Sequence, residues 1–292
     1  MIRLTPSSRF FLYVIYGLLL TTVLLYVRFP TDTFKSFCEQ RLEQSLKASD
    51  CSIKRIHYSF PVSVVFEKVH VITSSGEQKS AFTIDQFKFR PGIKFWQKFK
   101  MFGDLYSGTF RATLALDTDK KSYQLTDIVL NNLNLNTILK DQGVVDRKAT
   151  GTLGGSGRYS AEWDTPAAGE GKGRIEVKTG QIEFLQPILS LTAINFNRIN
   201  LDISVGEQVE IQQGKLKGKN LNADFEGSLD VMDSLLASRV RLSGLLEPKR
   251  EFLQSHPKEA KMVKQYAKRY KKSALPFKLR GTVANPTFRF SR

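Results

Sequence analysis

Few residues in this 292-residue chain have the types and the spacing that chemistry requires. Its two cysteines, Cys38 and Cys51, and its three histidines, His57, His70 and His256, supply no set of four zinc ligands at the usual spacing. No serine-centred nucleophile motif and no His-Glu-x-x-His pattern occurs. We therefore predict no metal, no cofactor and no catalytic residue, in a protein that is not an enzyme.

Two glycine-rich segments have the composition of phosphate-binding loops without their signature. Residues 151–157 (GTLGGSG) are not followed by Lys-Ser or Lys-Thr, and residues 171–173 (GKG) lack the hydroxyl residue that would bind magnesium. A strand pattern follows each segment, where a phosphate site would need the N-terminus of a helix. We interpret these glycines as strand and turn residues.

The two cysteines offer a choice between a disulfide and two thiols. In an oxidising compartment a bond between Cys38 and Cys51 would pin a helix to the first strand. It would contribute about 3 kcal/mol by restricting the unfolded chain. Two separate thiols, one on the buried face of the helix, are the alternative, and the sequence favours neither.

A basic and aromatic stretch is the sharpest candidate for a binding surface. We expect a short helix over residues 93–102, with lysines and aromatic rings that could rest in the headgroup region of an anionic bilayer. Nucleic-acid bases stack on the same residue types, but the location inferred below excludes nucleic acid as a partner. A helix packed on the core is the alternative reading. The candidate contacts are Lys94, Phe95, Trp96, Lys98, Phe99 and Lys100.

The elements that position these residues begin with a membrane anchor. Phe10–Val27 is an 18-residue run without a charged residue. As a helix it is about 27 Å long, close to the roughly 30 Å of hydrocarbon in a bilayer. A cleaved signal peptide and a buried core helix are the alternatives, but no small-x-small cleavage site follows the run.

The charges before this run predict its orientation. Arg3 and Arg9 precede it, and no acidic residue occurs before Asp32. The positive-inside rule therefore keeps residues 1–9 in the cytoplasm and sends the rest across the membrane. In a bacterium this describes a single-pass inner-membrane protein with its main domain in the periplasm. The net charge of +16 favours acidic partners such as anionic lipid headgroups.

Beyond the anchor, a juxtamembrane helix is expected within residues 28–50, and then the pattern alternates with period two. Ile199, Leu201, Ile203 and Val205 illustrate this pattern, which is typical of antiparallel sheets with one apolar face. We predict a mostly β domain over residues 51–292, with any division placed near residues 164–173. A second helix, basic and amphipathic, is expected from residue 255 to residue 272.

The order of these elements resembles the type II secretion system protein N family and the wider AsmA-like group. The resemblance rests on residues 53–61 (IKRIHYSFP), 151–157 (GTLGGSG), 171–177 (GKGRIEV) and 275–288 (LPFKLRGTVANPTF). It implies a non-catalytic inner-membrane component of the type II secretion system that acts in protein export through membrane anchoring and through contacts with other secretion components.

The AsmA-like resemblance also implies a shape and a second function. The shape is a long curved antiparallel sheet with an apolar concave face; an ordinary β-sandwich fits the alternation equally well. The second function is that of a lipid-binding or lipid-transfer module that holds phospholipid in an apolar groove. The candidate lining residues are Phe110, Leu114, Leu116, Leu201, Ile203, Leu221 and Phe225.

Overall fold

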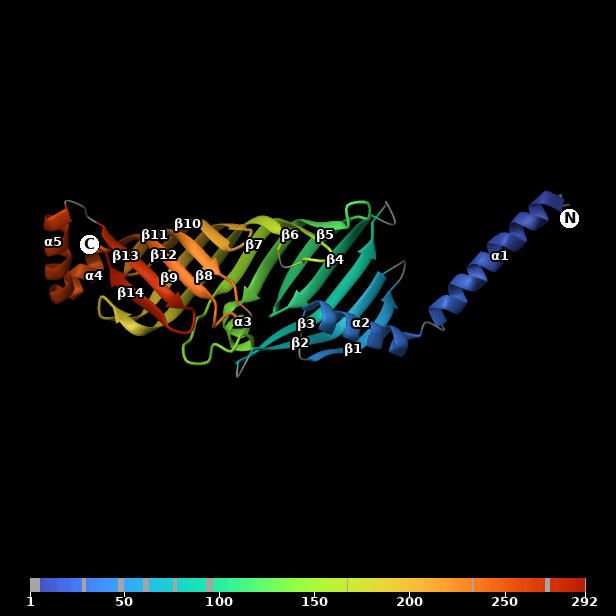
Figure 1. Ribbon diagram of the computed structural model, residues 1–292, viewed down its shortest axis with the longest axis horizontal. Coiled ribbons are helices and arrows are strands. Elements are labelled where there is room, and N and C mark those ends of the chain that lie inside the picture. The colour runs from blue at the N-terminus through green and yellow to red at the C-terminus, as the bar shows by residue number, and fades with distance from the viewer. Residues whose placement is uncertain are drawn as a thin grey trace.

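The computed structural model describes residues 6–27, 30–46, 50–59, 63–75, 78–92, 97–166, 168–232, 234–270 and 274–291. In this part of the chain, fourteen strands form one antiparallel sheet in which each strand pairs with the next in sequence (Figure 1). The strands are β1 (Asp50–Ser59), β2 (Ser63–Ser75), β3 (Gln78–Pro91), β4 (Lys98–Leu105), β5 (Gly108–Asp117), β6 (Ser122–Asn134), β7 (Thr152–Glu162), β8 (Glu170–Ile188), β9 (Leu191–Val205), β10 (Val209–Gly218), β11 (Leu221–Asp230), β12 (Arg239–Pro248), β13 (Leu275–Thr282) and β14 (Pro286–Phe290).

The prediction of a mostly β, antiparallel domain is therefore confirmed. The alternative of a β-sandwich does not hold, because β1 to β14 belong to one continuous sheet and not to two packed sheets. Residues 163–169 connect β7 to β8, and these two strands pair with each other, so the sheet continues across this connection.

Strand β8 keeps its apolar side chains in one cluster although their positions change from odd (Ile175, Val177) to even (Ile182). The change occurs at Thr179, which has a φ of +34°. The pairing with β9 keeps a single register from Gly171 to Glu183. The break in the alternation is therefore a local backbone feature of one long strand and not a turn between two strands.

Helices lie at both ends of the sheet. Helix α1 (Pro6–Val27) extends away from the sheet beyond β1, and α4 (Arg250–Ser255) and α5 (Pro257–Tyr270) lie at the opposite end (Figure 1). None of the helices, as far as their residues are described, combines the length and the apolar character that a membrane span needs. Helix α5 agrees with the basic helix expected there, whereas α4 was not anticipated.

Helix α2 (Thr31–Leu46) covers the edge of the sheet at β1. The carboxylate of Glu39 accepts a hydrogen bond from the backbone N–H of Ile53 at 2.7 Å, and that of Glu43 accepts one from Cys51 at 3.2 Å. These N–H groups would otherwise be unpaired at an exposed edge, which is a common site of unwanted strand addition. Phe34 and Leu42 of α2 pack on the apolar cluster of β1 and β2 beside this edge.

The basic and aromatic stretch is not a helix where the structure describes it. Lys94, Phe95 and Trp96 lie outside the described residues, while Lys98, Phe99 and Lys100 belong to strand β4. Phe99 stacks on Phe89 with ring centroids 4.6 Å apart. The alternation of lysine and aromatic residues is the period of a strand with one polar and one apolar face, so the expected short helix was wrong for residues 98–102.

Candidate binding groove

One apolar residue or glycine from every strand lies in a single row across the sheet. Each member is directly opposite the next in the strand pairing. The row contains no polar or charged residue, so one face of the sheet is apolar from end to end. We call it the apolar row; from β1 to β14 it consists of Ile56, Phe66, Phe87, Gly103, Phe110, Leu130, Gly155, Ile175, Leu201, Gly214, Phe225, Gly244, Phe277 and Phe290.

Glycines in the apolar row make room for the rings of neighbouring strands. A Cβ atom on Gly103 would overlap the ring of Phe110, and one on Gly214 would overlap the ring of Phe225. Each ring therefore lies over the glycine opposite to it. Alternation of small and large residues fills the inner side of a curved sheet without crowding. The glycines thus let the rings of Phe110 and Phe225 lie close against the sheet.

The seven residues predicted to line a groove all lie on the face of the apolar row. Phe110, Leu201 and Phe225 belong to the row itself, and the remaining four lie at alternate positions of β5, β9 and β11. Leu221 is fully buried, with 0% of its surface exposed, and belongs to a packed cluster. The other six are half-buried, and Phe110, Leu201 and Phe225 among them also pack against buried clusters. The six are Phe110, Leu114, Leu116, Leu201, Ile203 and Phe225.

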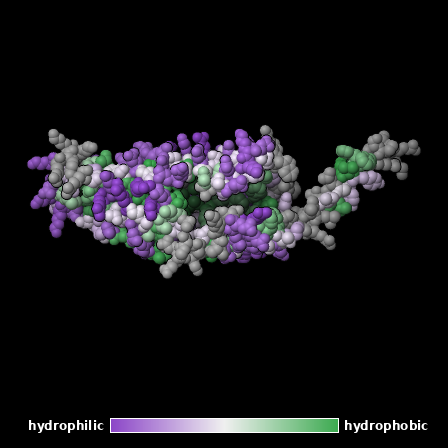
Figure 2. All heavy atoms as spheres, viewed as in Figure 1, coloured by the Kyte–Doolittle hydropathy of each residue, from purple (hydrophilic) through white to green (hydrophobic). Residues whose placement is uncertain are grey.

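The part of the groove near α2 is open and rich in aromatic rings. Phe87 stacks on Phe110 with ring centroids 5.9 Å apart and lies 5.8 Å from the ring of Phe66. Figure 2 shows a hollow with a hydrophobic floor between two hydrophilic rims in this part of the molecule. An apolar surface that opens between polar rims is typical of a binding groove.

The part of the groove near the C-terminal end is more enclosed. It contains a pocket of about 410 Å³ whose lining is almost entirely apolar and includes Ile194, Leu216, Phe225, Leu242 and Phe277. Phe252 of α4 and Val263 of α5 are buried in the same cluster and close this end of the groove.

A loop between helix α3 (Leu135–Asp141) and β7 lines the pocket through Arg147. We call residues 146–150 of this loop the strap. Lys148 and Thr150 of the strap pair with β8. The Glu183 N–H donates to the Lys148 carbonyl and the Lys148 N–H donates to the Glu183 carboxylate, each at 2.9 Å. The Thr150 N–H donates to the Gln181 carbonyl at 2.8 Å. The strap is thus a short addition to the edge of the β8–β9 hairpin.

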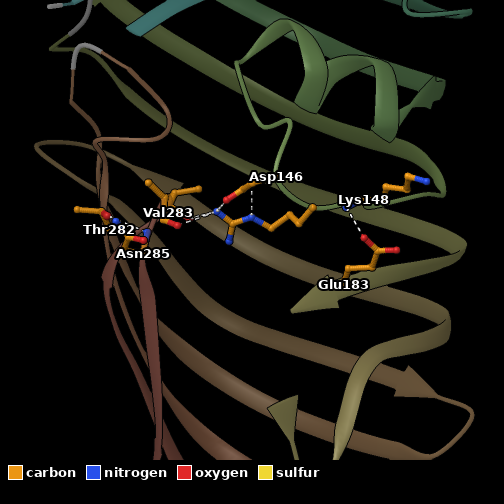
Figure 3. Close-up of polar contacts among 8 residues, drawn as sticks. Asp146, Lys148, Glu183, Thr282, Val283 and Asn285 are labelled. Atoms are coloured by element: carbon orange, nitrogen blue, oxygen red, sulfur yellow. Dashed lines mark hydrogen bonds and ion pairs between the residues drawn. The ribbon is translucent and has the colours of Figure 1, made fainter. Parts of the chain in front are cut away.

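Arg147 joins the strap to the turn between β13 and β14; Figure 3 shows its neighbour Asp146 beside Val283 of that turn. Its Nη2 donates to the carbonyls of Val283 at 3.0 Å and Ala284 at 2.8 Å, and its Nε donates to Asp146 at 3.1 Å. The Arg147 side chain is only 13% exposed. Hydrogen bonds from a charged donor are stronger than neutral ones, so Arg147 holds two parts of the chain together across the groove.

This contact shows how strongly the sheet is curled. Strands β8 and β13 are five places apart in the sheet. At a spacing of about 4.8 Å between neighbouring strands, they would be roughly 24 Å apart in a flat sheet. The strap on β8 nevertheless touches the turn after β13 through one arginine side chain. The C-terminal half of the sheet is therefore curved into a trough that Arg147 closes on one side.

We expect Arg147→Ala to loosen the turn between β13 and β14. Hydrogen bonds to a charged group are worth about 1.5–3 kcal/mol, so amide exchange in residues 236–238 and 283–285 should become roughly tenfold to a hundredfold faster. Arg111→Ala, at an exposed position of β5, is the matched control and should leave these amides unchanged. Equal protection in Arg147→Ala and in the unsubstituted chain would show that the arginine does not close the trough.

The two cysteines are both free thiols in the structure, where Cys51 is buried and Cys38 packs against its cluster. Burial raises the pKa of both thiols, and the nearby Glu39 carboxylate raises them further. Protonated thiols react slowly. The alternative of two separate thiols thus describes the structure, with Cys38 on the buried face of α2 as expected.

Among the described residues, no group of three or more histidine, cysteine, aspartate or glutamate side chains could hold a metal ion. Comparison with known proteins adds no candidate: no family model, no curated protein and no solved structure matches the chain. The groove itself is therefore the feature from which a function can be argued.

Proposed function

We propose that this protein binds the acyl chains of lipids in its groove, beside a membrane to which α1 anchors it. The apolar row is the observation that carries the proposal, because it runs through all fourteen strands without a polar residue. Apart from Ile56 and Phe277, which are buried, the side chains of the row are half-buried. A continuous apolar surface of this kind fits an elongated apolar ligand better than it fits a packed core.

The dimensions of the groove support this ligand class. Thirteen spacings of about 4.8 Å make the sheet roughly 62 Å long, about twice the 30 Å thickness of a bilayer hydrocarbon core. Several acyl chains could therefore lie end to end. Each methylene removed from water contributes about 0.8 kcal/mol to the binding free energy. No polar group would therefore be needed to hold the acyl chain.

The anchor is the second part of the proposal and rests on the sequence of the whole run, Phe10–Val27. The structure forms one helix over this run, and its described side chains from residue 10 to residue 17 are exposed. Arg3 and Arg9 before the run favour a periplasmic location for the sheet in a bacterium. The role in type II secretion, with other secretion components as partners, stays a prediction of the resemblance.

Photo-crosslinking in intact cells tests the proposal without detergent. A benzophenone amino acid in place of Leu201 would face the groove, whereas one in place of Asn200 would face the opposite side of the same strand. We expect mass spectrometry to find lipid adducts at position 201 and none at position 200. Absence of adducts at 201, or equal yields at both positions, would refute acyl-chain binding.

A further inference from the structure

Helices α4 and α5 form a second surface whose side chains differ sharply from those of the groove. A hollow of about 740 Å³ lies between the two helices. Its cations are Arg250 of α4 and Lys261, Lys264 and Lys268 of α5, and none of its described lining residues is acidic. Leu253, Pro257 and Ala260 form an apolar part of the lining.

The charges of α5 are separated by face. The helix has five lysines and arginines and one acidic residue, Glu259. The carboxylate of Glu259 accepts a hydrogen bond from Ser190, in the turn between β8 and β9, which lowers its pKa. Lys261, Lys264 and Lys268 are exposed, and their spacing of three and four residues places them on one side of the helix. The outer side of α5 is thus basic, while its one acidic side chain is bound to the sheet.

We propose that this basic hollow docks the C-terminal end of the sheet onto an anionic phospholipid bilayer. Exposed lysines attract anionic headgroups, at about 1 kcal/mol for each lysine near the surface. The apolar side of α5 packs on the sheet, so the contact would be made by the basic side through charge. An acidic protein would need matching charges at fixed positions, whereas a bilayer presents phosphates that can move to the four cations.

The position of the hollow supports a membrane partner. Figure 1 places α5 at the end of the sheet opposite to α1, and Figure 2 shows hydrophilic side chains gathered there. Met262, Val263 and Tyr266, on the other side of α5, pack on the cluster that closes the groove. Docking would therefore bring the closed end of the groove to a lipid surface away from the anchor. This inference does not require that the groove holds lipid.

The test uses the full chain, inserted through its N-terminal helix into nanodiscs of phosphatidylcholine. Vesicles of phosphatidylcholine, with or without phosphatidylglycerol, are then added. We expect capture of the phosphatidylglycerol vesicles only, and weaker capture as salt rises, because salt screens exposed charges. Equal capture of both vesicle types, or capture that salt leaves unchanged, would overturn the proposal.

The matched variants distinguish vesicle binding through this surface from attraction by the overall positive charge of the protein. The triple variant Lys261→Gln, Lys264→Gln and Lys268→Gln should lower vesicle affinity by roughly a hundredfold, at about fivefold for each lysine. The control triple variant, Lys172→Gln, Lys215→Gln and Lys217→Gln, removes the same charge from exposed strand positions and should lower the affinity by no more than a few-fold. An equal loss of vesicle affinity in both triple variants would overturn the proposal. So would binding of the nanodisc-held chain to an acidic protein from an extract, if the same chain does not bind phosphatidylglycerol vesicles.

The two proposals fail in different experiments. If the basic hollow does not dock, position 201 still gives lipid adducts in the photo-crosslinking experiment. If the groove is empty, the phosphatidylglycerol vesicles are still captured through α5.

Discussion

Leu201→Asp should abolish lipid binding in the middle of the groove and leave the protein folded. Leu201 is half-buried and lies between Ile175 of β8 and Gly214 of β10 in the apolar row. A carboxylate there would lose part of its hydration whenever an acyl chain covered it, at a cost of several kcal/mol. We expect lipid adducts at a second probe in the groove, in place of Ile203, to fall at least a hundredfold.

The matched control is Asn200→Asp, which places the same carboxylate one residue away on the opposite face of β9. Asn200 is opposite Lys215 and Glu176 in the neighbouring strands, so the new charge would not touch the groove. Adduct yield should be unchanged in this control. Circular dichroism and thermal unfolding of both variants distinguish a blocked groove from a lost fold.

The outcome also decides between a groove and a packed core. If Leu201 belonged to a filled interior, Leu201→Asp would bury an unpaired charge and the chain would unfold. Phe110→Asp makes the same distinction in the half of the groove near α2. Loss of folding in both variants, with intact folding of Asn200→Asp, would show that the concave face is filled by protein.

The sequence predicts the faces of the strands well because alternation is a local property. Ile199, Leu201, Ile203 and Val205 were assigned to one face, and the pairing with β8 and β10 confirms this. Which residue lies opposite which is not local, since it depends on the register of each strand pair. The apolar row and its glycines could therefore be recognised only in the structure.

Other features could not be read from the sequence because they depend on contacts between distant residues. Arg147 bonds to carbonyls 136 and 137 residues further along the chain, and neither partner has a recognisable motif. The break in the alternation at Thr179 looks like a turn in the sequence, although β8 continues through it. The alternation of Lys98, Phe99 and Lys100 looks like a helix with mixed faces when only its composition is considered, and there the period of the side chains was the better guide.

The largest loss of stability is expected where the strap, the sheet and α3 meet, at Phe196. This side chain is 2% exposed and forms a cluster with Val177 and Ile199. A Cβ atom on Gly180 would lie 2.8 Å from the ring of Phe196, so this glycine leaves room for the ring. Leu135 at the start of α3 packs on the same cluster. One ring therefore supports the point at which the strap leaves β8.

Phe196→Ala should lower the free energy of unfolding by about 3–5 kcal/mol, because it removes a buried ring and leaves a cavity that the stiff sheet cannot refill. Phe102→Ala, on β4, is the control, since Phe102 is 42% exposed and its loss should cost less than about 1 kcal/mol. Denaturant unfolding of the two variants measures the difference. Equal stabilities would mean that the cluster around Phe196 collapses around the missing ring, and that the strap is held by its hydrogen bonds to β8 and by Arg147 alone.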